Sequence, residues 1–165
     1  MNIRAISAAD LSNLARLHAA SFSEAWSERA LQELLAMPGT FGFAAQNGFI
    51  LARVADDEAE ILTIAVTPEA RRAGLGSALL AAAAHRASEL GARTLFLEVG
   101  DANSAARALY DRFAFRTVGK RKAYYGVHGE DALILRAELP LPALGKLPAS
   151  TRLDPKPRGI DRDAD

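Results

Sequence analysis

Cysteine is absent from the sequence, and so are a net charge and any long apolar run. The lack of cysteine excludes disulfides, zinc–thiolate sites and a cysteine nucleophile. The 20 basic and 20 acidic side chains cancel, which argues against a protein that binds nucleic acid directly through a basic surface. The longest apolar run, residues 78–84, is much shorter than the roughly 20 residues of a membrane-spanning helix. We therefore expect neither a membrane span nor direct nucleic-acid binding.

The composition changes sharply near residue 140. Half of the 165 residues are hydrophobic, which is enough for one folded domain of ordinary size. Five of the seven prolines lie between residues 140 and 157, and most residues beyond 153 are charged, Pro or Gly. We predict a folded domain over 1–139 and a Pro-rich, charged, disordered tail over 140–165, with a docking segment as the alternative. The amino terminus lacks the features of a signal peptide, so we expect a cytoplasmic protein.

Apolar spacing and turn residues divide the domain into alternating elements. Strands are expected at 3–6, 41–46, 49–55, 61–66, 93–99, 115–125 and 132–138, and helices at 7–20, 28–36, 74–90 and 103–113. The resulting order is one strand, two helices, three strands, a helix, a strand, a helix and two strands. Consecutive strands imply antiparallel pairing, and the mixture of strands and helices predicts a mixed α/β fold.

Residues that cap helices and form turns support these boundaries. Ser7 and Asp10 have the spacing of a capping box, and Ser27 is expected to cap the second helix. Asn47-Gly48 is a strong signal for a two-residue hairpin turn. Gly91 stands where a helix commonly ends in the left-handed conformation.

The segment 61–77 combines a strand, a basic glycine-bearing turn and the start of a helix. Gly74 and Gly76 let a ligand approach the backbone, and the first N–H groups of a helix lack intrahelical partners. Arg71 and Arg72 add positive charge, so the turn suits a pyrophosphate, although a tight connection alone would also explain it. A dinucleotide-binding fingerprint would need Gly or Ala at Leu79, and a P-loop would need Gly-Lys-Ser/Thr after its first glycine.

The run Arg71-Arg72-Ala73-Gly74-Leu75-Gly76 resembles the Gln/Arg-x-x-Gly-x-Gly/Ala signature of the GCN5-related N-acetyltransferase (GNAT) family, and the resemblance extends over about 1–139. Several further segments are similar to the bacterial RimI-type branch, which acetylates the N-terminal alanine of a small-subunit ribosomal protein. They are Ile64-Ala65-Val66, Leu97-Glu98-Val99, Asn103, Ala108-Leu109-Tyr110 and Tyr124-Tyr125. The resemblance implies a mostly antiparallel central sheet flanked by helices, with acetyl-CoA as the co-substrate.

The resemblance also implies roles for individual residues. The backbone of Ile64, Ala65 and Val66 would pair with the pantetheine amides, and Asn103 would contact the cofactor. The pyrophosphate would be wrapped by Arg71, Arg72, Ala73, Gly74, Leu75, Gly76 and Ser77. Glu98 corresponds to the general base, and Tyr110 to the general acid that protonates the departing thiolate.

These roles agree with the chemistry of acetyl transfer to an amine. An α-amine with a pKa of about 7.7–8.0 is roughly one-tenth neutral at pH 7, whereas a lysine with a pKa of about 10.4 is neutral less than about one time in a thousand. An α-amine therefore needs only a modest base, and the missing cysteine excludes an acetyl-cysteine intermediate and favours direct attack in a ternary complex. Transfer to a small-molecule amine or a lysine, and a non-catalytic acyl-CoA-binding module, remain alternatives.

Ordinary structural roles are also open for these residues. Glu98 could be a solvent-facing strand residue, Tyr110 could belong to the core, and Asn103 could be a helix N-cap. The three histidines, His18, His85 and His128, lack metal-ligand spacing, so no metal site is expected. The basic residues over 112–122 are interpreted as a solvated surface.

Two departures from the RimI-type pattern are visible. Gly100 and Asp101 replace an arginine and a small residue, which affects acceptor selection. Ala114 replaces a glycine, which requires either a negative φ or some strain. Nothing in the sequence predicts an oligomeric state.

Overall fold

The structure is a computed structural model that describes residues 2–22, 25–125 and 130–143. The chain divides into two units, Met1–Ala92 and Arg93–Asp165. The sequence also predicts a turn at His128-Gly129, but these two residues and most of the predicted tail lie outside the described residues.

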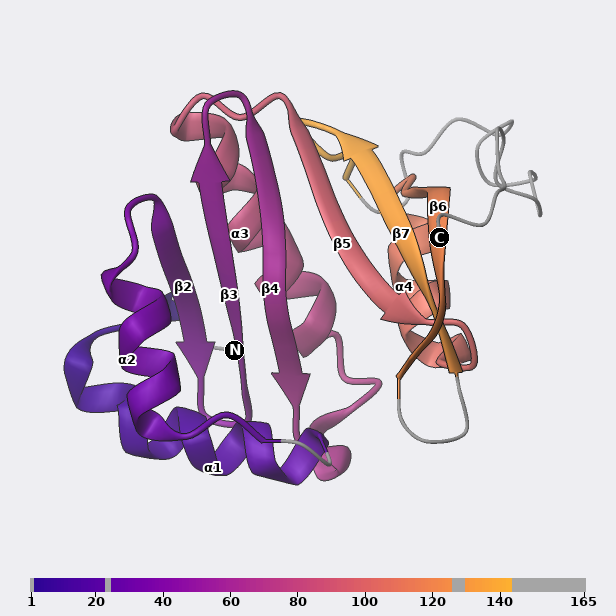
Figure 1. The fold of residues 1–165 in the computed structure, drawn as a ribbon. Helices are drawn as coiled ribbons and strands as arrows, with labels where there is room; N and C mark the ends of the chain where they lie inside the picture. The colour runs from indigo at the N-terminus through magenta and orange to yellow at the C-terminus, as the bar shows by residue number, and fades with distance from the viewer. Residues whose placement is uncertain (1, 23–24, 126–129, 144–165) are drawn as a thin grey trace. The chain divides into compact units, whose positions relative to one another are not determined.

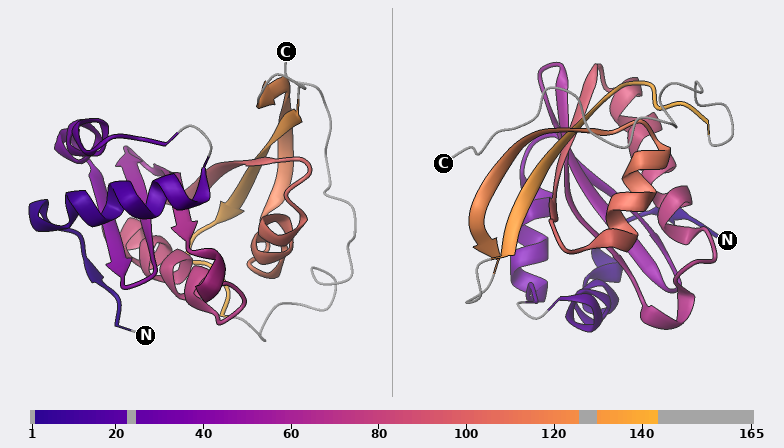
Figure 2. Two further views of the ribbon diagram at one scale, coloured as in Figure 1. Left: turned by 90° about the horizontal axis from the view of Figure 1, so that it is seen from below. Right: turned by 90° about the vertical axis from the view of Figure 1, so that its right-hand side faces the viewer.

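The first unit is an antiparallel sheet with helices on both faces. Its elements are β1 (Arg4–Ala5), a 3₁₀ turn (Ala8–Asp10), α1 (Leu11–Ser21), α2 (Glu28–Ala36), β2 (Thr40–Ala45), β3 (Gly48–Ala55), β4 (Glu58–Val66), a second 3₁₀ turn (Pro68–Ala70) and α3 (Leu75–Glu89). The strands follow the order β1-β2-β3-β4, and Figure 1 shows β2, β3 and β4 side by side. Helices α1 and α2 cover one face of this sheet and α3 covers the other (Figure 2).

The core of the first unit lies between α1, α2 and the sheet. Leu14, Leu17 and Leu31 from the helices pack with Phe49 and Leu51 from β3, and all five are fully buried. On the other face α3 buries its apolar side through Leu79, Leu80, Ala83, Ala84 and Ala87. Strand β3 lies between these two layers and is buried on both faces from Gly48 to Ala52.

The capping residues predicted for this unit are confirmed, although Ser7 begins a 3₁₀ turn and α1 starts only at Leu11. Asp10 accepts a hydrogen bond from the backbone N–H of Ser7 at 2.8 Å, and the Arg4 guanidinium bonds both carboxylate oxygens. These contacts lower the pKa of Asp10 to about 2, so it is charged at neutral pH. The Ser27 hydroxyl accepts from the Ala30 N–H at the start of α2. Gly91 has a φ of 99° after the end of α3.

The predicted hairpin turn at Asn47-Gly48 is wrong by one residue. Ala45 pairs with Gly48, so the two-residue turn is Gln46-Asn47 and Gly48 is the first residue of β3. A Cβ at Gly48 would lie 2.7 Å from the carbonyl oxygen of Ala65. The glycine is therefore required by the close approach of β4 and not by the turn.

Strand β4 is longer than the pattern of apolar residues predicted. It begins at Glu58 and not at Ile61, because the acidic residues after β3 belong to a second hairpin. Ala55 pairs with Glu58, which leaves Asp56 and Asp57 as a two-residue turn with Asp56 at a φ of 56°. Asp tolerates this left-handed conformation better than most residues do.

The second unit is a three-stranded antiparallel sheet with one helix. Its elements are β5 (Thr94–Gly100), α4 (Ser104–Arg112), β6 (Arg116–Tyr125) and β7 (Glu130–Glu138). The strand order is β5-β7-β6, and α4 covers one face (Figure 2). With the 3₁₀ turns set aside, the order of elements over the whole chain is the one predicted from the sequence.

Ala114 ends α4 in a conformation that favours glycine. Its φ is 68°. The Ala114 N–H donates a hydrogen bond to the carbonyl of Asp111, and the Phe115 N–H donates one to the carbonyl of Tyr110. This is the Schellman arrangement that Gly91 forms after α3.

We expect Ala114→Gly to raise the free energy of unfolding by about 1 kcal/mol, since a left-handed L-residue costs about 1–2 kcal/mol. Urea unfolding measures this, and a lower midpoint for the variant would contradict it.

Candidate active site

The end of β4 carries the three residues expected to pair with pantetheine. Ile64, Ala65 and Val66 pair with Ile50, Phe49 and Gly48 of β3. The β3–β4 register slips by one residue at Leu62, so β4 has a bulge just before this segment. β4 is the last strand in the order of the first unit.

The turn after β4 is fastened to the end of the strand. Arg71 Nε donates a hydrogen bond to the carbonyl oxygen of Val66 at 3.0 Å, and the Thr67 N–H bonds to the carbonyl of Asn47 at 2.9 Å. Arg72 and Gly74 have φ angles of 67° and 89°. These contacts hold the exposed turn of residues 71–74 against the β2–β3 hairpin.

The first turn of α3 provides donors for an anion. The helical hydrogen bonds begin with the one from the Ala78 N–H to the carbonyl of Gly74. The N–H groups of Leu75, Gly76 and Ser77 come before it and therefore have no hydrogen-bond partner within the helix. The helix dipole adds about half a positive charge at this end. Arg72 is exposed and has no ion-pair partner among the described residues. The residues predicted to bind the pyrophosphate thus lie next to one another in the first unit, and anion binding by them stays a prediction.

Glu98 lies in the second unit, in the second half of β5. Its side chain is 30% exposed and alternates with the buried Leu97 and Val99. Arg121 of β6 places Nη1 3.2 Å from Oε1 of Glu98. Sequence reasoning treated Arg121 as part of a solvated basic stretch and missed this pair, because the two residues are 23 positions apart and only the strand register connects them.

Tyr110 is almost fully buried on α4, with 4% of its surface exposed. Its ring packs edge-on against Phe115 at 5.6 Å between centroids. Side-chain alternation places Glu98 on the face of the β5-β7-β6 sheet that α4 does not cover. Glu98 and α4, the helix that carries Tyr110, therefore lie on opposite faces of this sheet.

Asn103 caps α4, as the structural interpretation of the sequence predicted. Its Oδ1 accepts from the Ala106 N–H at 3.1 Å. Asp101, one of the departures noted above, accepts from Arg107 at 3.1 Å and donates its N–H to the carbonyl of Asp131. These bonds fix the turn between β5 and α4, and cofactor contact by Asn103 stays a prediction.

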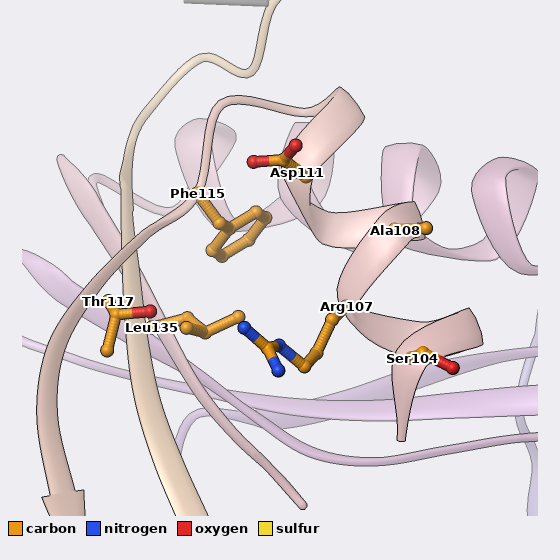
Figure 3. A pocket seen from close by; sticks show the side chains of 7 residues that line it. All are labelled: Ser104, Arg107, Ala108, Asp111, Phe115, Thr117 and Leu135. Carbon is orange, nitrogen blue, oxygen red and sulfur yellow. The ribbon is translucent and has the colours of Figure 1, made fainter. Parts of the chain in front are cut away.

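A cavity of about 250 Å³ lies beside α4 within the second unit (Figure 3). It is lined by Ser104, Arg107, Ala108, Asp111, Phe115, Thr117 and Leu135. Neither Glu98 nor Tyr110 lines it, so it is separate from the predicted catalytic groups.

Within the described ranges no cluster of His, Asp and Glu side chains is arranged to hold a metal ion. In the same residues, every helix is too short or too polar to cross a bilayer. The expected absence of a metal stays a prediction.

The strand, glycine-bearing turn and helix start of the first unit agree with the class to which sequence comparison assigns the chain, the acetyltransferases that use acetyl-CoA. The chain belongs to the acetyltransferase (GNAT) family, whose sequence model matches residues 11–115. Both the predicted family and the mixed α/β fold with mostly antiparallel strands are confirmed.

Individual relatives narrow the similarity to one branch. The N-alpha-acetyltransferase RimI of Mycobacterium tuberculosis is 32% identical over 149 residues, which is 84% of this chain and 92% of that protein. The ribosomal protein bS18-alanine N-acetyltransferase of Escherichia coli (strain K12) is 41% identical over 96 residues, 54% of this chain and 65% of that protein. A crystal structure of the Escherichia coli ribosomal-protein-S18-alanine N-acetyltransferase has a TM-score of 0.75 at 30% identity and covers 83% of this chain and 92% of that chain.

Proposed function

We propose that this acetyltransferase transfers the acetyl group of acetyl-CoA to the N-terminal α-amine of a protein, namely the N-terminal alanine of a small-subunit ribosomal protein. The observation that carries the proposal is the similarity over 84% of the chain to an enzyme named for N-α-acetylation. The Escherichia coli relatives, named for alanine of a ribosomal protein, support the choice of acceptor.

The first unit supplies the groups for acetyl-CoA. The pantetheine amides pair with the backbone of Ile64, Ala65 and Val66, and the pyrophosphate accepts hydrogen bonds from the N–H groups at the start of α3. Arg72 supplies a second source of positive charge, while Arg71 holds the turn through its bond to the Val66 carbonyl. Asn103 of the second unit contacts the cofactor in addition to capping α4.

The reaction is a direct transfer in a ternary complex. The amine nitrogen attacks the thioester carbonyl carbon, a C–N bond forms, and the C–S bond breaks with its electron pair leaving on sulfur. Glu98 accepts the amine proton directly or through water, and the Tyr110 hydroxyl gives a proton to the thiolate. Two separate residues are needed because the incoming nitrogen loses a proton while the departing sulfur gains one.

A panel of peptide acceptors tests the proposal. We expect mass spectrometry to find one acetyl group on the α-amine of an alanine-terminated peptide and none on its N-terminally blocked form. Acetylation only of a lysine-containing blocked peptide, or of small amines, would replace the proposed acceptor. Binding of acetyl-CoA without product from any acceptor would indicate a non-catalytic module.

A further inference from the structure

The candidate base has a cation beside it before any acceptor is bound. Arg121 Nη1 donates to Oε1 of Glu98 at 3.2 Å. Among the described residues, this is the one side-chain contact recorded for the Glu98 carboxylate. An acceptor amine arrives as an ammonium for most of the time at neutral pH, so it is a second cation that needs this same carboxylate.

The strand register explains how Arg121 reaches Glu98 across β7. Ile134 of β7 pairs with Glu98 of β5 on one side and with Gly119 of β6 on the other. Arg121 lies two residues beyond Gly119 on β6 and pairs with Ala132 of β7. All five positions lie on the face that α4 does not cover, by the alternation of side chains along each strand. Gly119 and Ala132 carry no side chain beyond Cβ, so the long arginine side chain has space to cross the middle strand.

We propose that Arg121 is a positioning residue that occupies the cation position beside Glu98 in the acceptor-free enzyme, and that the acceptor's ammonium displaces it. This inference rests on the proposed function, in which Glu98 is the base. Acceptor binding then exchanges one cation for another, and an acceptor with a blocked, neutral terminus cannot displace the guanidinium.

The exchange also gives a direction to the catalytic cycle. One proton of the bound ammonium passes through Glu98 to solvent before the neutral amine attacks. A second leaves the nitrogen through Glu98 and solvent and restores the Tyr110 hydroxyl after that group has protonated the thiolate. The product is then a neutral amide and the carboxylate is again anionic. The amide cannot compete with a guanidinium for that carboxylate. The return of Arg121 to Glu98 therefore assists product release.

The pair is weak enough to be exchanged at each turnover. The side chains of Arg121 and Glu98 are 43% and 30% exposed. Ion pairs at such positions typically change an equilibrium by a factor of roughly 1.5 to 5. We therefore expect Arg121→Gln to lower the KM for an alanine-terminated peptide about two- to fivefold and to strengthen inhibition by the acetylated peptide.

Two further variants separate this exchange from a general effect of charge. Arg121→Lys keeps a cation on the same strand position and should retain a KM near that of the unaltered enzyme. Lys122→Gln removes the same charge from the exposed next residue of β6 and should leave the KM nearly unchanged. Thermal unfolding of each variant shows whether the fold is retained.

The outcomes distinguish the two proposals. An unchanged or higher KM in Arg121→Gln, or an equal fall in Lys122→Gln, would overturn the exchange while leaving N-terminal acetylation intact. If the unaltered enzyme acetylates no α-amine in the peptide panel, the proposed function fails and the exchange fails with it.

Discussion

Glu98→Gln should lower the turnover of an alanine-terminated peptide by about 10²- to 10⁴-fold, the usual contribution of a positioned acid or base. Glutamine has nearly the same shape and can still accept a hydrogen bond from Arg121, but its amide cannot take a proton from the amine. Acetyl-CoA affinity should stay unchanged, because the proposed cofactor contacts come from residues 64–66, 71–77 and 103 and not from the Glu98 carboxylate. Steady-state kinetics and isothermal titration calorimetry with acetyl-CoA measure the two effects.

Glu138→Gln is a matched control for this substitution. Glu138 lies on β7 of the same sheet, and its carboxylate is 3.1 Å from the guanidinium of Arg136. Like Glu98→Gln, this control removes the carboxylate of a Glu–Arg ion pair. The Glu138 side chain, however, is 71% exposed and lies outside the candidate site. Its turnover should match that of the unaltered enzyme. If Glu98→Gln keeps turnover within about threefold, Glu98 is not the base.

The parts of the fold that depend on neighbouring residues were predictable from the sequence. The cap of α2 by Ser27 and the left-handed end of α3 at Gly91 both depend on contacts within a few positions. The order of strands and helices likewise follows from local spacing of apolar residues. All the residues that determine these features lie within a few positions of one another, so the sequence alone was enough to predict them.

The parts that depend on distant contacts were not predictable in this way. Gly48 was assigned to a turn, although the contact that demands a glycine comes from Ala65 on the next strand. The pairing of Arg121 with Glu98 depends on the register of β6 and β7, including a slip between Thr117 and Gly119. No periodicity in the sequence encodes that slip.

The predicted catalytic residues illustrate both cases. The apolar neighbours Leu97 and Val99 already indicate that Glu98 points to the other face of the strand. The contact between the Tyr110 and Phe115 rings is local, because these residues occupy the C3 and C″ positions of the Schellman motif that ends α4, whereas the near-complete burial of Tyr110 depends on the packing of α4 on its sheet. Their chemical roles came from the family resemblance and remain predictions for the Glu98 variant to test.

Gly74→Ala should weaken the binding of acetyl-CoA by about ten- to a hundredfold. Gly74 precedes α3 with a φ of 89°, a conformation that costs an L-residue about 1–2 kcal/mol. Relief of that strain rotates the peptide groups before the helix and turns the free N–H groups of Leu75 and Gly76 away from the pyrophosphate. Losing one hydrogen bond to a charged group costs about 1.5–3 kcal/mol, which corresponds to the expected loss of affinity.

The other end of the same helix provides the control for Gly74→Ala. Gly91 has a φ of 99°, and a Cβ built there meets no atom within 4 Å. Gly91→Ala therefore introduces similar backbone strain, and both variants should lose about 1–2 kcal/mol in urea unfolding. Only Gly74→Ala should lose affinity for acetyl-CoA in calorimetry, because only that end of α3 presents free N–H groups. Equal affinities in the two variants would show that the start of α3 does not bind the pyrophosphate.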